Sequence, residues 1–245
     1  MSRARLQAPG LQRASSRPGG RAPAYPTIDI APHADAVLEG LVERLQEFDL
    51  AVFISRNAVD YGLACVLARR AWPQPLRLAA IGAGTRSALE SHGLGPVLAP
   101  GGHADSEALL ALPEMSTVSG LRIVVFRGQG GRALLAETLR ARGASVEYAE
   151  CYRRILPDTD MAPLLAEWAR GGVDAIAVSS GQALGNFARL VGAEGLRHFA
   201  QTPVFVPHPR VAEQARALGA QQVLTAGPSD AEMIQALVAY FSASR

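Results

Sequence analysis

The stretch that decides the fold reads LAVFISRNAV at residues 50–59, and a second version of it reads DAIAVSSGQAL at residues 174–184. In each copy a short apolar run of strand-forming residues leads to a serine and then into a helical pattern. The two serines, Ser55 and Ser180, lie 125 residues apart, and the acidic triplet DSE at residues 105–107 recurs as DAE at the same offset. A strand and helix repeated in this way predict two similar α/β lobes with a cleft between them.

Short apolar runs alternate with helical patterns along most of the chain. The runs are rich in Val, Ile and Ala, and the helical segments place apolar residues three and four positions apart, as at Val211, Ala215 and Leu218. Such alternation predicts parallel sheets that are covered by helices on both faces. Nine strands are expected, at residues 27–30, 50–55, 77–81, 96–98, 121–126, 145–149, 174–178, 203–207 and 222–224.

Length and composition are typical of a globular protein with two domains. The 245 residues allow two domains of about 120 residues each, and a hydrophobic content of 49% suits a sizeable core. No apolar run approaches the roughly 20 residues that span a bilayer, and residues 1–24 lack the apolar region of a secretory signal. Cys65 and Cys151 belong to no CxxC or Cys/His cluster, so we expect no metal site. The sequence therefore predicts a cytoplasmic protein that does not enter membranes.

The basic residues limit the kinds of ligand and of catalytic chemistry that the chain can have. All 24 of them are arginine, and five fall within residues 1–24, where there is no acidic residue. The 19 that remain are balanced by 22 acidic residues, so the body lacks the basic excess of a nucleic-acid-binding domain. The absence of lysine excludes a Schiff-base lysine, a pyridoxal-phosphate anchor and a P-loop lysine. Arginine suits ligands that carry carboxylates or phosphates.

The loops that follow the predicted strands carry the candidate ligand contacts. Ligands of parallel α/β proteins bind beyond the carboxyl ends of the strands, and helix starts in such loops attract anions. Serine and threonine also act simply as N-caps there, and for any single one of them both roles stay open. Together the loops predict a polyanionic ligand, with candidate contacts at Ser55, Asn57, Thr85, Arg127, Gly128, Arg132, Ser179, Ser180, Pro207 and Arg210.

Other chemistries are less well supported. The stretch GAGTRS at residues 82–87 follows a predicted strand but lacks the third glycine of a dinucleotide-binding loop. No serine sits in a GxSxG elbow, and the five histidines show no spacing that would pair them with a nucleophile or a metal. Among the histidines only His208, between two prolines at a strand end, merits attention, and a structural role is favoured for it.

Six stretches carry a resemblance to a known family: FISRNAV at 53–59, AIGAGT at 80–85, DSEALL at 105–110, RIVVFRGQGGR at 122–132, GASV at 143–146 followed by CYRR at 151–154, and IAVSS at 176–180. In order and spacing they are similar to the uroporphyrinogen-III synthases, from Tyr25 to the C-terminus. The resemblance implies an α/β fold of two flavodoxin-like lobes with parallel sheets, joined by a two-stranded linker. We expect residues 25–32 and 153–245 in a lobe built from both chain ends, and residues 33–152 in an inserted lobe.

The resemblance also implies a reaction. Such an enzyme takes hydroxymethylbilane, a linear tetrapyrrole with eight carboxylates, removes its hydroxyl as water and closes the ring with the fourth pyrrole inverted. No cofactor is needed, and the family's favoured proton donor, a tyrosine, falls on Tyr152. We expect a monomer that receives its substrate from the upstream deaminase. The alternatives are a two-lobed binding protein for a small anion, without catalysis, and a synthase homologue inactivated by its N-terminus.

Two departures from the family pattern stand out. Many relatives carry a Gly-Pro-x-Thr-like loop where this chain reads VPHPR at residues 206–210, so a threonine contact is not carried over and Arg210 is the candidate replacement. Residues 1–24 occupy the place of the family's first strand and helix but have no helical period and contain three prolines. We expect an atypical, disordered Arg-rich N-terminus. A shifted reading frame or misplaced start is preferred over a transit peptide or a tail.

Overall fold

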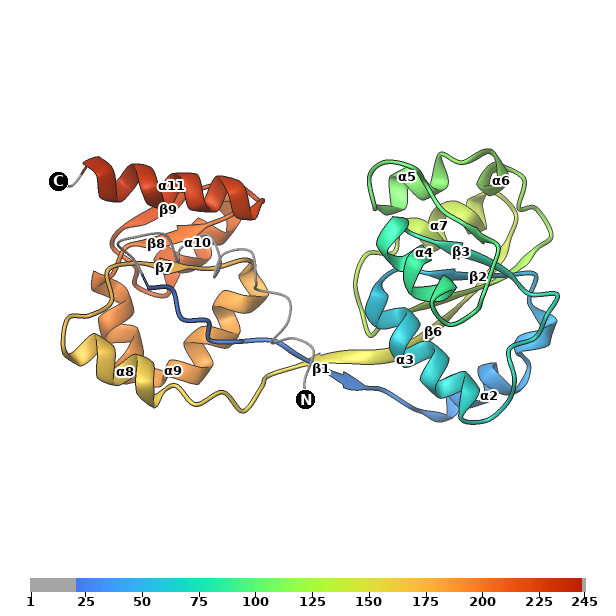
Figure 1. Cartoon of the computed structure of the whole chain (residues 1–245), viewed down its shortest axis with the longest axis horizontal. Coiled ribbons are helices and arrows are strands. Elements are labelled where there is room, and N and C mark those ends of the chain that lie inside the picture. Colours follow the sequence, from blue (N-terminus) through green and yellow to red (C-terminus); the bar gives the residue numbers. More distant parts are fainter. Residues whose placement is uncertain (1–20, 244–245) are drawn as a thin grey trace. The chain divides into compact units, whose positions relative to one another are not determined.

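The computed structural model describes residues 21–243 and divides the chain into two compact units (Figure 1). Unit 2 is continuous, from Ala31 to Arg154, whereas unit 1 combines the chain up to Ile30 with the chain from Ile155 onward. The sequence prediction placed the corresponding boundaries after residues 32 and 152.

Two paired strands connect the units. Strand β1 (Asp29–Pro32) leads into unit 2, and the long strand β6 (Ser145–Ile155) leads out of it. The two are neighbours in one sheet, and the backbone N–H of His33 donates to the carbonyl of Cys151 at 3.0 Å. Both boundaries between the units fall within these strands. The connection is therefore a hydrogen-bonded ribbon instead of two free linkers.

Unit 2 is built on a six-stranded sheet with the order β1-β6-β5-β2-β3-β4, in which the five strands from β6 to β4 pair in parallel. Besides β1 and β6, its strands are β2 (Leu50–Phe53), β3 (Arg77–Ala80), β4 (Val97–Leu98) and β5 (Arg122–Gly128). Without β1, the sheet has the 2-1-3-4-5 strand order of flavodoxin, because β6, β5, β2, β3 and β4 stand in the places of its strands 2, 1, 3, 4 and 5. The chain ends therefore fall at a different point of the same order. The chain reverses its direction across the sheet between β2 and β5, and that reversal makes their carboxyl ends the topological switch point.

Helices cover both faces of this sheet. They are α2 (Ala36–Glu43), the 3₁₀ turn η2 (Leu45–Glu47), α3 (Arg56–Leu67), α4 (Ala83–Glu90), α5 (Ser106–Leu110), α6 (Pro113–Ser116) and α7 (Leu134–Ala141). Phe53 and Phe126 stack with their ring centroids 4.5 Å apart beside α3, where Gly62 leaves room for the Phe126 ring. Their strand neighbours Val52 and Val125 join a buried cluster with residues of α5, α6 and α7. Two buried faces explain why these strands read as unbroken apolar runs.

Unit 1 has a smaller parallel sheet of the order β7-β8-β9. Its elements are α8 (Ala162–Ala169), β7 (Ile176–Ala177), α9 (Gly181–Gln201), β8 (Val204–Val206), α10 (Pro209–Ala217), β9 (Val223–Thr225) and α11 (Asp230–Ala243). Helix α9 is interrupted at Gly192, whose φ of 64° is open to glycine at little cost. The core of the unit gathers around Trp168, Phe187 and Phe199.

The sequence repeat corresponds to a structural one. At an offset near 125 residues, β2, β3 and β4 match β7, β8 and β9, and α3 matches the first part of α9. In contrast, β5 and β6 have no counterpart among the described residues of unit 1, so β7 pairs there on one side only. The predicted N-terminal tail lies mostly outside the described residues, and residues 21–28 form no helix or strand.

The predicted α/β fold with parallel sheets is confirmed. All nine expected strands occur in the described part of the chain, with ends shifted by a few residues. The largest difference is β6, which was expected to end at residue 149 and continues to Ile155. The charged pair Arg153 and Arg154 resembles a strand end, but β1 provides a partner strand there.

Neither a membrane-spanning helix nor a metal-binding cluster is found among the residues that the structure describes. Across residues 21–243 no helix is long and apolar enough to cross a membrane. Within the same range no three His, Cys, Asp or Glu side chains gather in a way that could hold a metal ion.

Packing at Gly62 gives a test of this core. A Cβ there would lie 2.7 Å from Cδ1 of Phe126, and that ring is held by Phe53 and Trp72, so we expect Gly62→Ala to cost about 1–3 kcal/mol of unfolding free energy. Gly40, inside α2 with open space around it, is the control, and Gly40→Ala should stabilise by about 0.5–1 kcal/mol. Urea unfolding followed by Trp72 fluorescence in a Trp168→Phe background reports on unit 2. Equal effects of the two substitutions would contradict the close packing.

Candidate functional site

The candidate site of unit 2 lies at the switch point, where β2 and β5 end side by side. Helix α3 starts directly after β2, with Ser55 as its N-cap, and β5 ends at Gly128. A register shift after Arg127 places Gly128 opposite Tyr152 of β6. Three of the predicted residues, Ser55, Gly128 and Tyr152, are therefore brought together.

Tyr152 is held from several sides. Its side chain is buried, with 5% exposed, and its hydroxyl lies 3.1 Å from Oγ of Ser55. Its ring packs against that of Tyr61, and its backbone carbonyl accepts from the N–H of Gln129 at 2.7 Å. A Cβ on Gly128 would come within 2.4 Å of the Tyr152 ring. Glycine is required at residue 128 to let the ring occupy this place.

Ser55 links Tyr152 to helix α3. Its Oγ accepts from the backbone N–H of Ala58 at 3.0 Å, which is the N-cap bond. A hydroxyl has one proton and two lone pairs, so Ser55 can still either donate to the phenol oxygen or accept from it. When Ser55 donates, the phenol proton of Tyr152 is available to a third group. The pair is thus able to pass a proton outward from a buried tyrosine.

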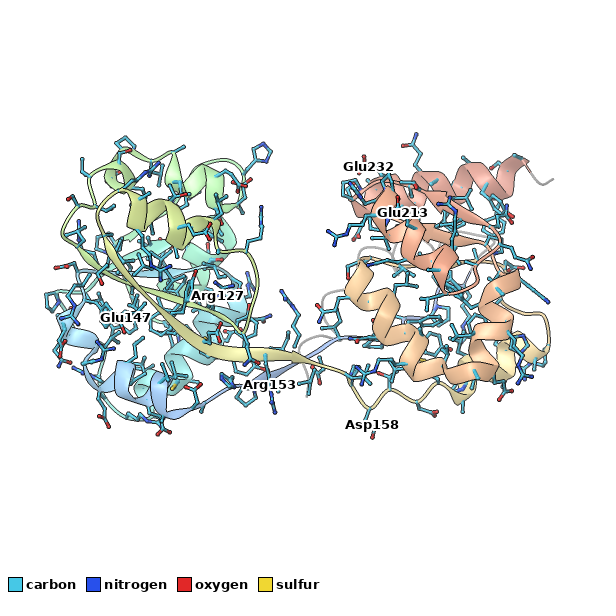
Figure 2. The ribbon with its side chains drawn as sticks, turned by 180° about the vertical axis from the view of Figure 1, so that it is seen from behind. Arg127, Glu147, Arg153, Asp158, Glu213 and Glu232 are labelled. Carbon is cyan, nitrogen blue, oxygen red and sulfur yellow. The ribbon has the colours of Figure 1, made fainter. Side chains whose placement is uncertain are left out.

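Arg127 supports the loop that follows β5. The side chain is buried inside unit 2, with 4% exposed (Figure 2). Its Nε donates to the carbonyl of Gly128 at 3.2 Å and its Nη2 to that of Gly130, while Nη1 lies 3.5 Å from that of Arg132. The guanidinium also lies 4.5 Å from the ring centroid of Tyr148, in a cation–π contact. These bonds hold Gly128 in place beneath Tyr152.

The other predicted residues of unit 2 do not meet Tyr152 in any described contact. Thr85 is buried in the first turn of α4, and Asn57 is half-buried in the first turn of α3. Arg132 is exposed and forms an ion pair with Glu107 at 3.2 Å. These three residues lie near the carboxyl ends of β3, β2 and β5 respectively, which is the edge where the prediction expected them.

The predicted residues of unit 1 lie at the carboxyl ends of β7 and β8. Ser180 is the N-cap of α9 and accepts from the N–H of Ala183 at 3.1 Å, repeating the geometry of Ser55. Ser179 precedes it and is exposed, and Pro207 follows β8. Arg210 is exposed in the first turn of α10, where its backbone N–H donates to Nδ1 of His208. His208 thus has a structural role as the N-cap of α10.

Burial makes one nearby thiol unreactive. Cys151 precedes Tyr152 and points its Sγ toward the carbonyls of Arg127 and Ala58, at 3.4 and 3.7 Å. Desolvation raises the pKa of this thiol to about 12. Since only the thiolate is a good nucleophile, Cys151 takes no part in covalent chemistry near neutral pH.

The sequence did not single out two aromatic residues that shape this site. Tyr61 follows Ser55 by six residues on α3 and lies against Tyr152. Tyr148 lies four residues before Tyr152 on β6 and receives the guanidinium of Arg127 on its face. Spacing along β6 and α3 is compatible with these contacts but equally with ordinary core packing, so the contacts could be seen only in three dimensions.

Comparisons with known proteins identify the family to which the chain is similar. A family model described as Uroporphyrinogen-III synthase HemD matches residues 10–235. The chain is 36% identical over 211 residues to the uroporphyrinogen-III synthase of Salmonella typhimurium, covering 84% of this chain and 85% of that protein. It is 32% identical over 209 residues to the same enzyme of Escherichia coli, with the same coverage of both chains. The chain belongs to the uroporphyrinogen-III synthase family.

Solved structures of the family share the fold. The uroporphyrinogen-III synthetase of Helicobacter pylori superposes with a TM-score of 0.58 at 12% identity, covering 91% of this chain and 94% of that one. A mutant synthase of Thermus thermophilus gives a TM-score of 0.55 at 16% identity, covering 98% and 95%. At these identities the likeness supports the two-lobed α/β architecture alone.

The bond between Ser55 and Tyr152 is testable by a double-mutant cycle. Ser55→Ala and Tyr152→Phe each remove one partner, so we expect a coupling free energy of about 0.5–1.5 kcal/mol. Asp105→Ala removes another N-cap bond of unit 2, the one that the Asp105 carboxylate accepts from the N–H of Ala108, and serves as the control, whose effect should add to that of Tyr152→Phe without coupling. Urea unfolding followed by Trp72 fluorescence in the Trp168→Phe background measures both cycles. Additive effects of Ser55→Ala and Tyr152→Phe would exclude an energetically significant bond.

Proposed function

We propose that the chain converts hydroxymethylbilane into uroporphyrinogen III, with loss of water and inversion of the fourth pyrrole ring. Membership of the family supports this assignment. The observation that carries it within the structure is the hydrogen-bonded pair of Ser55 and Tyr152 at the switch point of unit 2, seated on Gly128. Ligands of doubly wound folds bind at such a place.

Tyr152 is the proposed proton donor. Hydroxide is a poor leaving group, so protonation of the departing hydroxyl as its carbon–oxygen bond breaks releases water and leaves a phenolate. The hydroxyl of Ser55, which lies 3.1 Å from the phenol oxygen, then donates to the phenolate and stabilises it. Ser55 in turn is oriented by the N–H of Ala58. The lost proton returns to Tyr152 from the pyrrole that is deprotonated after the ring closes.

The remaining predicted residues are proposed to contact the substrate or to position groups that do. Arg127 positions the loop of residues 128–132 through its hydrogen bonds to carbonyls there. Direct contacts with substrate carboxylates or backbone are assigned to Ser55, Asn57, Thr85, Gly128, Arg132, Ser179, Ser180, Pro207 and Arg210. We further propose a cytoplasmic monomer that needs no cofactor and receives its substrate from the upstream deaminase.

The test of this function is the isomer of the product. Hydroxymethylbilane closes without an enzyme to uroporphyrinogen I, so formation of the III isomer, separated chromatographically after oxidation, identifies the activity. We expect Tyr152→Phe to lower turnover at least several-fold while the far-UV circular dichroism stays unchanged, because only the donor proton is lost.

A matched variant separates this role from the general loss of a phenol. Tyr240→Phe removes a hydroxyl that lies 3.3 Å from Oε1 of Gln222 in unit 1, and it should keep full turnover. Unchanged turnover in Tyr152→Phe would remove Tyr152 from the acid role. A wild-type protein that yields only the I isomer would refute the proposed function and favour an inactive homologue.

A further inference from the structure

A small cavity lies behind the loop that Arg127 supports. Its volume is about 20 Å³, and it opens between the carboxyl ends of β2 and β5 and the helices α5 and α7. Its polar lining consists of Arg127, Arg132, Ser106 and Tyr148, and its apolar walls include Val125 and Leu135. The proton transfer proposed for Tyr152 does not involve this cavity.

Tyr148 is the unusual member of the lining. Its hydroxyl is fully buried and has no hydrogen-bond partner among the described residues. A buried hydroxyl without a partner destabilises the fold, so its presence in a site calls for an explanation. The explanation does not lie in the ring alone, because phenylalanine would offer the same aromatic face to Arg127. An oxygen acceptor that enters the cavity would satisfy the phenol.

The charge around the cavity selects an anion. Arg127 is buried without an ion pair among the described residues, and its bonded partners are neutral carbonyls. Three of its five N–H groups take part in these contacts, which leaves two for a ligand. Arg140 lies 5.5 Å from the ring centroid of Tyr148 but does not line the cavity, and its Nη2 donates to the carbonyl of Val146. The carboxylates nearby are already engaged, Glu107 with Arg132 and Glu150 with the N–H of Gly130.

We propose that this cavity is a subsite for one carboxylate of the substrate, bound by the Tyr148 hydroxyl and the free N–H groups of Arg127. A volume of about 20 Å³ has room for about one oxygen atom, so one oxygen of a carboxylate enters the cavity and a pyrrole ring does not. The inference rests on the proposed function, since hydroxymethylbilane supplies such carboxylates.

Tyr148 is then a binding residue, distinct from Tyr152. A contact made equally to substrate and transition state raises KM on removal and leaves kcat unchanged. We expect Tyr148→Phe to raise KM for hydroxymethylbilane about tenfold or more with kcat unchanged, since the variant loses a hydrogen bond to a charged group. If Tyr148 were only a core residue, removing an unpartnered hydroxyl would leave KM unaltered and keep or raise stability.

A second measurement does not depend on activity. Sodium acetate, compared with sodium chloride at equal ionic strength, should raise the Tm of unit 2 in the wild-type protein, and this difference should vanish in Tyr148→Phe. Tyr240→Phe is the control and should behave as the wild type in both assays. Arg127 is left intact, because its loss would release the loop of residues 128–132.

The outcomes distinguish the subsite from the proposed function. An unchanged KM in Tyr148→Phe, or an acetate effect of the same size in Tyr148→Phe and wild type, would overturn the subsite while the formation of uroporphyrinogen III still stands. Conversely, the wild-type protein could form no III isomer while acetate raises its Tm and does not raise that of Tyr148→Phe. That result would refute the function and retain a carboxylate site.

Discussion

The contact between Gly128 and the ring of Tyr152 is the constraint on which the rest of the site depends. No side chain other than hydrogen fits at residue 128, and the register shift after Arg127 is what places that residue opposite Tyr152. The guanidinium of Arg127 fixes the shifted loop by donating to the carbonyls of that loop, and Ser55 fixes the hydroxyl end of the phenol. A buried cation, a glycine and a helix cap thus act together to orient one hydroxyl group.

Much of the fold could be predicted because burial on both faces of a parallel sheet leaves a plain record in the sequence. The apolar runs located all nine strands, and the offset between Ser55 and Ser180 correctly paired two helix starts of the same geometry. The strand ends were less accurate where a partner strand, not local propensity, sets the length. Strand β6 continues to Ile155 because β1 lies beside it (Figure 2), and the residues around Arg153 do not indicate that a partner strand is present.

The candidate site was predictable as a set of loops but not as a set of contacts. Residue type and position placed Ser55 and Gly128 at strand ends, the family resemblance pointed to Tyr152, and the fold brings the three together. Arg127 was expected to contact a ligand, and the structure adds three hydrogen bonds from its guanidinium to carbonyls of its own loop, which residue type and position do not reveal. Whether the Tyr148 hydroxyl has a hydrogen-bond partner depends on the atoms around it in three dimensions, and the spacing of residues along β6 does not predict it.

The division of unit 1 between the two ends of the chain also sets an order of events during synthesis. Unit 2 is complete once Arg154 has left the ribosome, and domains fold as units during synthesis, the earlier one first. The segment before Ile30 must wait for much later residues, because Pro26 accepts from Thr159 and Thr27 accepts from Asn186. These partners lie 133 and 159 residues later in the chain, so at translation rates of about 5–20 residues per second the delay is on the order of ten seconds, during which Pro26 and Thr27 stay without them. The inserted unit therefore folds first, and the ribbon of β1 and β6 then holds the waiting segment close to the chain that completes its unit.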